Sequence, residues 1–513
     1  MKRGFEKKRG SLSLSKGHKR YIFLIAFFFI CAFCFSQQIH PSIEPVFLPE
    51  DVLVNANREN WSLSADEVFR LALLCSECPL ESDAGEKCLL IFEKIKAEVS
   101  SDDFMQLELE ERGRAVLKLL YRDYLTTYNF NQTKIDTAIL TGVYNCVSSG
   151  VLYLAAAKAA GLEVRGQKTT EHAFCSVYVP NASGSKTNQL KKIDVETTNP
   201  YGFNPGSREA IENEDKIQGY YVVPKKYYAN RQEVSDIIFA GLIAGNLCSY
   251  YVEKNDYMNS IPLGAARYDA VLLEKNNSKA AGDVRRDFDV LAANYMNHMP
   301  ESSLTYAKMM DWFMTFIDRW GMTSFLQKNM DISFNNLMVL CFDERNYELA
   351  DTYYKKAQPY ISQKEIETAK EILTDTLVLS MTEGLGAQEQ INIIDELIAG
   401  GSLDSVQTKR AQLYLENAWL AILNGCMDYK TYEEGLRRAS EALVSLPQSS
   451  KIKKMQKAFY DNCIAIIHNN FAKLANAGDY EGARSILDEG LQKFPEDKTL
   501  KSDLVLLNKR TSN

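Results

Sequence analysis

One segment restricts the fold of this chain more than any other. Residues 146–160 read CVSSGVLYLAAAKAA, an apolar helical stretch that Asn145 can cap at its start and Gly161 can end. A helix with so few polar side chains has to be buried on most of its sides. Short β-type runs follow it, so the order of elements predicts an α+β domain with one buried helix on a small, antiparallel sheet.

Three runs supply the strands of that sheet. Residues 162–164, 172–179 and 192–198 are rich in β-branched and aromatic side chains and alternate in polarity. The turn-rich loop 180–185 separates the last two runs. Two antiparallel neighbours joined by such a loop place the start of one strand near the end of the other.

A candidate nucleophile begins the buried helix. Cys146 lies in the first turn, where unpaired N–H groups and the helix dipole favour a thiolate. The chain has five histidines, and His172 alone falls within the predicted α+β segment. It opens a strand, so its ring can project from the end of a rigid sheet. A neighbouring imidazole would stabilise the reactive thiolate.

Asp194 is the carboxylate that we expect to complete the group. It lies on the next strand between Ile193 and Val195. A carboxylate beside the ring would fix the tautomer and the orientation of His172, giving a Cys146–His172–Asp194 triad. Each of these residues taken singly is more often structural: a buried thiol, a satisfied histidine and a solvated acid.

The same residues resemble the transglutaminase-like, papain-related superfamily of thiol proteins. The landmarks are the approach Gly142-Val-Tyr-Asn-Cys146, the helix exit Ala159-Ala-Gly-Leu-Glu-Val164, His172-Ala-Phe174 and Ile193-Asp-Val-Glu-Thr197. The resemblance covers residues 141–206 and implies a cysteine-protease fold that forms a thioester. It implies the Cys146 N–H as one oxyanion donor, with the side chains of Tyr144 and Asn145 as open candidates for the second.

The N-terminus resembles an export signal. Eight Lys or Arg and one Glu precede the apolar run 21–35, and Cys34 and Ser36 fit the small positions before a cleavage at Gln37. We therefore expect residues 1–36 to be a signal peptide and the protein to be exported to a periplasm or the outside. The alternative is an uncleaved anchor, the only part expected to meet a membrane.

Charge and cysteine usage exclude other classes. The first 36 residues carry +7, so the rest of the chain carries −15 rather than −8, which disfavours binding to nucleic acid. Cys75-Ser-Glu-Cys78 has no second ligand pair, so no metal site and no cofactor are expected. A local disulfide or two buried thiols are both compatible with this pair.

Helical periodicity dominates outside the α+β segment. We expect a helical region over 37–104, the transglutaminase-like domain over 105–235, a helical region with one degenerate repeat over 236–330, and helical repeats over 331–513. Four segments set a small residue three positions after a tyrosine; these tyrosines are Tyr257, Tyr347, Tyr432 and Tyr480. The pattern resembles tetratricopeptide repeats, and an irregular helical bundle is the alternative.

Two functions follow from these patterns. The first is an exported thiol enzyme, a peptidase or amidase acting on a peptide or protein through a thioester. The second is a scaffold without turnover that binds a peptide or protein partner through its helical repeats.

Overall fold

The computed structural model describes residues 40–53, 62–181, 190–205, 230–274, 279–298, 300 and 302–511. It contains helices and two small sheets, so the expected α+β class is confirmed. The chain divides into two compact units, Met1–Tyr295 and Met296–Asn513. The predicted signal peptide at 1–36 lies outside the described residues. Within the described ranges, no helix is long and apolar enough to cross a membrane.

The first unit begins with helices that surround the buried one. Ser64 and Glu67 form a capping box that starts α2, and Ser82 caps α3 through the Gly85 N–H. Helical periodicity runs through residues 104–127, but the structure forms two helices there, the short α4 and the longer α5. The bounds are η1 Pro49–Asp51, α2 Ala65–Cys75, α3 Asp83–Val99, α4 Asp102–Met105, α5 Leu109–Asp123 and α6 Ile135–Thr141.

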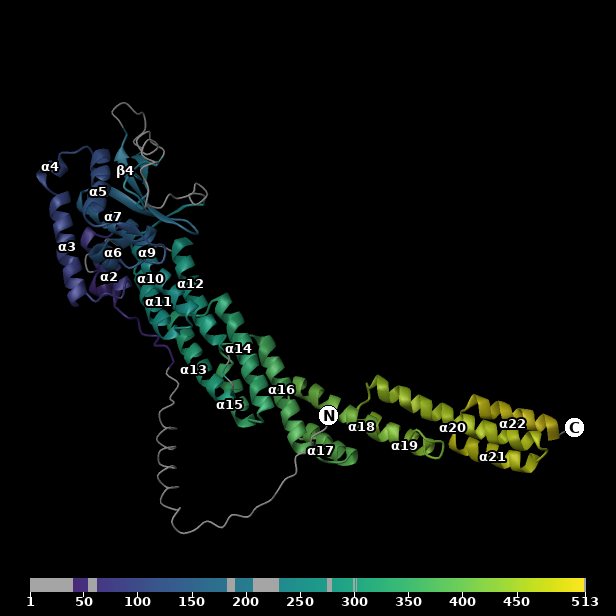
Figure 1. Ribbon diagram of the computed structural model, residues 1–513. Helices are drawn as coiled ribbons and strands as arrows, with labels where there is room; N and C mark the ends of the chain where they lie inside the picture. The colour runs from purple at the N-terminus through teal and green to yellow at the C-terminus, as the bar shows by residue number, and fades with distance from the viewer. Residues whose placement is uncertain are drawn as a thin grey trace, which may run out of the picture. The chain divides into compact units, whose positions relative to one another are not determined.

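The predicted central helix is α7, Cys146–Ala159. The side chain of Asn145 accepts hydrogen bonds from the N–H groups of Val147 and Ser148, and the Ser148 hydroxyl returns a bond to the Asn145 N–H. The helix contacts α2, α3, α5, α6 and strands β3 and β4. The element expected from its apolar sequence is therefore enclosed on most of its sides, as Figure 1 shows.

A four-stranded antiparallel sheet follows α7. Its strand order is β5-β4-β3-β6, with the bounds β3 Glu163–Lys168, β4 Ala173–Pro180, β5 Leu190–Val195 and β6 Gln232–Val234. The short edge strand β6 was not anticipated from the sequence. A separate parallel pair, β1 Thr127–Tyr128 and β2 Val143–Tyr144, leads directly into α7.

Phe239 fixes how α7 lies against the sheet. It belongs to α9, Asp236–Ala240, and is fully buried. A Cβ on Gly166 of β3 would come within 2.3 Å of the Phe239 ring, and one on Gly150 of α7 within 3.1 Å. Gly166 therefore cannot carry a side chain without displacing α9 from the sheet.

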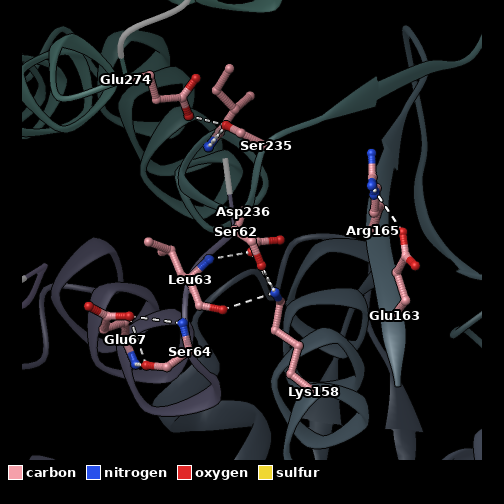
Figure 2. Close-up of polar contacts among 11 residues, drawn as sticks. Ser62, Leu63, Ser64, Glu67, Lys158, Glu163, Arg165, Ser235, Asp236 and Glu274 are labelled. Carbon is pink, nitrogen blue, oxygen red and sulfur yellow. Dashed lines mark hydrogen bonds and ion pairs between the residues drawn. The ribbon is translucent and has the colours of Figure 1, made fainter. Parts of the chain in front are cut away.

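A buried ion pair holds the last turn of α7. Lys158 Nζ lies 2.7 Å from a carboxylate oxygen of Asp236 and also donates to the Leu63 carbonyl, at 2.9 Å, as Figure 2 shows. Asp236 Oδ2 accepts the Leu63 N–H at 2.7 Å. These contacts join three chain segments far apart in sequence, and they fix the end of α7 opposite to Cys146.

Helices complete the first unit and form all of the described second unit. In the first they are α10 Leu242–Glu253, α11 Tyr257–Leu272 and α12 Lys279–Met296. In the second they are α13 Ser303–Trp320, α14 Ser324–Asp343, α15 Tyr347–Ala357, α16 Gln363–Thr382, α17 Ala387–Ala399, α18 Ser405–Gly425, α19 Tyr432–Ser445, α20 Ser450–Asn476, α21 Tyr480–Lys493 and α22 Lys498–Thr511.

The tyrosine pattern marks helix starts. Tyr257, Tyr347, Tyr432 and Tyr480 each begin a helix. The small residues three positions later are buried, and α19 and α21 both pack on α20. The helical character of the second unit is thus confirmed, and its assignment to a repeat family stays a proposal.

Candidate active site

Cys146 is the first residue of α7, and its position follows from the Asn145 cap. The cap takes the N–H groups of Val147 and Ser148 and leaves that of Cys146 beside the sulfur. The residue is 8% exposed. Cys146 therefore lies at the positive end of the helix dipole, with its own N–H beside the sulfur. The location expected from the sequence is the one observed.

The structure brings His172 to Cys146. The imidazole directly precedes β4 and is hydrogen-bonded with the Cys146 side chain. Burial alone would lower the pKa of His172. Hydrogen bonds and charge interactions with Cys146 and Glu196 outweigh that effect and raise the pKa to about 10. These interactions favour the imidazolium, the state that stabilises a neighbouring thiolate.

Glu196 is the carboxylate that contacts this ring. Its Oε2 lies 2.7 Å from His172 Nε2, and the two side chains are 3% and 1% exposed. Its other oxygen, Oε1, accepts from the Thr198 hydroxyl at 2.8 Å and the Thr198 N–H at 3.2 Å. Because Nε2 is occupied by Glu196, Nδ1 is the ring nitrogen that can face the sulfur. Glu196 therefore orients the imidazole.

The loop after β5 holds Glu196 in place. The Glu196 N–H donates to the Gly202 carbonyl at 2.8 Å, and Phe203 forms a bridge with Val195. A Cβ on Gly202 would lie 1.8 Å from the Glu196 carbonyl oxygen, so only glycine permits this approach. The loop turns back on the strand end instead of leading directly away from it.

The prediction of Asp194 as the third residue was wrong. Asp194 Oδ1 accepts from Ser176 Oγ at 2.8 Å, and Oδ2 pairs with Arg231. In the register of β4 and β5, Asp194 is opposite Ser176, four residues along the strand from His172. At about 3.3 Å per residue that is roughly 13 Å, well beyond a hydrogen bond.

The strand register also contains the signal that identifies Glu196. If the pairing continued past Val195, Glu196 would oppose Phe174 and would lie diagonal to His172. Diagonal neighbours are about 7–8 Å apart, a distance that two long side chains can bridge. The last observed pair, Pro180 and Leu190, encloses nine residues. The shorter loop 180–185 expected from the sequence gives a different register, which is why Glu196 was not identified.

Neither proposed side chain is aimed at an oxyanion near Cys146. The Asn145 amide is committed to the cap and to the Phe130 carbonyl, which accepts from Nδ2 at 3.2 Å. The Tyr144 hydroxyl donates to the Thr198 carbonyl at 3.1 Å and accepts from Tyr121 at 2.9 Å. The Cys146 N–H is the one expected donor that remains at the site.

The other thiols of the first unit have different surroundings. Burial raises the pKa of Cys75, Cys88 and Cys248 to about 12, and that of Cys175 well above its usual value. The nine described cysteines are all free thiols, so the pair at Cys75 and Cys78 is not a disulfide. Within the described ranges, no group of three or more His, Cys, Asp or Glu side chains could hold a metal ion.

Comparison with known proteins gives no family. No model of a known protein family matches the chain, and no curated protein is a detectable relative. The function therefore has to be argued from the geometry around Cys146.

Proposed function

We propose that this protein is a thiol hydrolase of the transglutaminase-like type that cleaves amide or peptide bonds. The observation that carries the proposal is the buried series Cys146–His172–Glu196 at the start of a helix. A thiolate, an imidazolium and an orienting carboxylate are the three roles that nucleophilic acyl transfer requires. The helix-on-sheet architecture agrees with the resemblance seen in the sequence.

The chemistry follows from these roles. The Cys146 sulfur attacks the substrate carbonyl carbon, forming a C–S bond and an oxyanion that the Cys146 N–H can stabilise. When the C–N bond breaks, His172 gives its proton to the leaving amine and a thioester remains. His172 then takes a proton from water, whose oxygen attacks the thioester. The C–S bond then breaks, and the products are a free acid and the regenerated thiolate–imidazolium pair, with Glu196 holding the ring in position throughout.

Two further parts of the proposal rest on the sequence alone. The basic and apolar segment before Gln37 supports export, with an uncleaved anchor as the alternative. Hydrolysis is preferred to transfer because no feature of the sequence selects for an amine acceptor. The substrate class is a peptide or a protein with an accessible amide.

Alkylation of Cys146 by iodoacetamide tests the proposal directly. We expect modification at pH 7 to occur at Cys146 well before the buried thiols whose pKa lies near 12, as followed by mass spectrometry of tryptic peptides. The His172→Ala variant should react at least about tenfold more slowly, because the thiolate loses its counter-ion. Equal rates in the two proteins would refute a functional Cys–His pair.

One observation favours the second candidate function, a binding protein without turnover. Cys146 is only 8% exposed, so a substrate has to displace whatever covers the sulfur. In that case the helical unit would recruit a peptide or protein. A Cys146→Ala variant that keeps its cellular function, together with loss of function on deletion of 416–497, would establish this alternative.

A further inference from the structure

A cavity of about 420 Å³ lies in the first unit, away from the candidate active site. It is open to solvent on one side and is lined by residues of α10, α11 and α12, which lie side by side (Figure 1). Its apolar lining includes Val252, Val284, Phe288 and Leu291. Cavities of roughly 300–1,000 Å³ with apolar walls are typical of small-molecule sites. The volume is thus large enough for an organic ligand.

A buried guanidinium lines this cavity. Arg267 of α11 is 7% exposed, and its flat face lies on the backbone of α10: a Cβ on Gly245 would be 3.0 Å from Arg267 Cζ. Its Nη1 lies 3.1 Å from Asp287 of α12, while its Nε is buried and makes no hydrogen bond. The Nε–H of this buried cation is therefore unsatisfied, which is costly for a buried charge.

The charge of Arg267 is poorly balanced by its surroundings. Asp287 is 56% exposed, so water screens its attraction. The nearby thiols of Cys75 and Cys248 have a pKa raised to about 12 by burial, so they are neutral at physiological pH. The other charged groups that line the cavity, Glu253 and Arg286, are exposed at its surface. An anion beside Arg267 would supply a second partner, less screened by water than Asp287.

We propose that this cavity binds a free carboxylate attached to an apolar body, with the carboxylate on Arg267 and the body against Val284, Phe288 and Leu291. Guanidinium and carboxylate match in geometry and form charge-assisted hydrogen bonds. A small organic acid and the C-terminal residue of a peptide share this chemistry. The site is independent of the proposed hydrolase function, because it uses none of the residues around Cys146.

Isothermal titration calorimetry on the full-length protein tests the site with two matched probe pairs. The first pair is 4-phenylbutyrate and 4-phenylbutyramide, and the second is N-acetylphenylalanine and N-acetylphenylalaninamide. We expect at least one acid to bind with a dissociation constant of about 1 mM or lower, as a dozen heavy atoms allow. Its amide should bind roughly tenfold or more weakly, because it lacks the charge.

Three variants assign the binding to Arg267. The Arg267→Gln variant should lose the preference for the acid. Asp287→Asn removes the competing carboxylate at a position more than half exposed, so it should fold normally and strengthen acid binding by about threefold or more. Arg345→Gln, in the other unit, is the control and should bind like the unaltered protein.

The two probe pairs distinguish the two sources of the carboxylate. Binding of phenylbutyrate alone identifies a small acid, and binding of the acetylated amino acid identifies a peptide terminus. Equal affinity for acid and amide, failure of both acids to bind, or no strengthening in Asp287→Asn would each overturn the proposal.

Discussion

The two compact units differ in the burial of their ion pairs. In Met1–Tyr295, two pairs are largely removed from water, Lys158 with Asp236 and His172 with Glu196. A buried charge is costly unless its partner is present, so each of these pairs depends on both of its members. Loss of one side chain therefore affects the fold and the candidate site together.

In the second unit, Met296–Asn513, close packing between helices contributes more to stability than ion pairs do. Ion pairs such as Lys457–Asp461 lie on its surface, with side chains 74% and 57% exposed, and pairs of this kind contribute little. Its helices approach closely where a small residue meets a large one, as Gly435 meets Phe459. We therefore expect loss of one charge to cost more at the buried pairs of the first unit than at the exposed pairs of the second, where a volume change at such a contact is the more damaging substitution.

The largest expected effect breaks the buried pair of the first unit. Lys158→Ala leaves the Asp236 carboxylate buried without its cation, which should lower the free energy of unfolding by about 3 kcal/mol or more. The measurement is hydrogen exchange of α7 peptides across a urea series. The exposed counterpart Lys457→Ala should cost less than about 0.5 kcal/mol in α20.

A double variant sharpens this test. Lys158→Met combined with Asp236→Asn removes both charges and keeps an acceptor for the Leu63 N–H. It should recover most of the stability lost in Lys158→Ala, because no uncompensated charge remains. If the double variant were as unstable as the single one, the damage would come from lost packing of the lysine stem.

The raised pKa of His172 predicts how stability depends on pH. A pKa raised from 6.5 to about 10 by folding stabilises the protein fully below pH 6.5, and this contribution is lost as pH rises toward 10. Stability should therefore fall across that range by up to about 1.4 kcal/mol per pH unit. His172→Asn should show a shallower fall, whereas parallel slopes in urea unfolding would contradict the assignment.

The chain order and the physics of single elements account for what could be predicted. The apolar run after Asn145 is stable only as a capped and buried helix. The local sequence therefore predicted α7 and the position of Cys146 at its start. His172 followed because a strand must begin near it. Asp194 was wrong because strand register depends on pairing across a loop, which residue patterns alone do not fix.

The sequence did not predict the short strand β6, for a related reason. Gln232–Val234 has three residues, two of them polar, and is a strand only because β3 offers it an edge. A similar limit applies to Arg267, since burial of its guanidinium depends on how Gly245 lets α11 lie on α10. Tertiary contacts determine both the formation of β6 and the burial of Arg267. A local sequence pattern contains no information on such contacts.

A matched pair of carboxylate variants tests the corrected site. Glu196→Gln should slow alkylation of Cys146 by about tenfold at pH 7, because the orienting charge on His172 is lost. Asp194→Asn should leave the rate within about twofold, since Asp194 contacts Ser176 and Arg231 instead. The reverse order of effects would restore the residue that the sequence first indicated.

The smallest expected effect concerns the shape of the second unit. Gly435→Ala places a Cβ 2.6 Å from Phe459 Cε1, so the buried ring or α19 has to shift. Overpacking of this kind costs about 1–3 kcal/mol, and the better helix propensity of alanine returns up to about 1 kcal/mol. The net loss should therefore be about 1 kcal/mol, measured by urea unfolding with Trp419 fluorescence as the probe.

Gly425 provides the control for that substitution. A Cβ there meets no atom within 4 Å, so Gly425→Ala keeps the gain in helix propensity without the collision and should be neutral or slightly stabilising. If both variants behaved alike, close approach of α19 to α20 would not be what holds them together. The contrast between a unit sensitive to charge and a unit sensitive to volume would then fail on its second half.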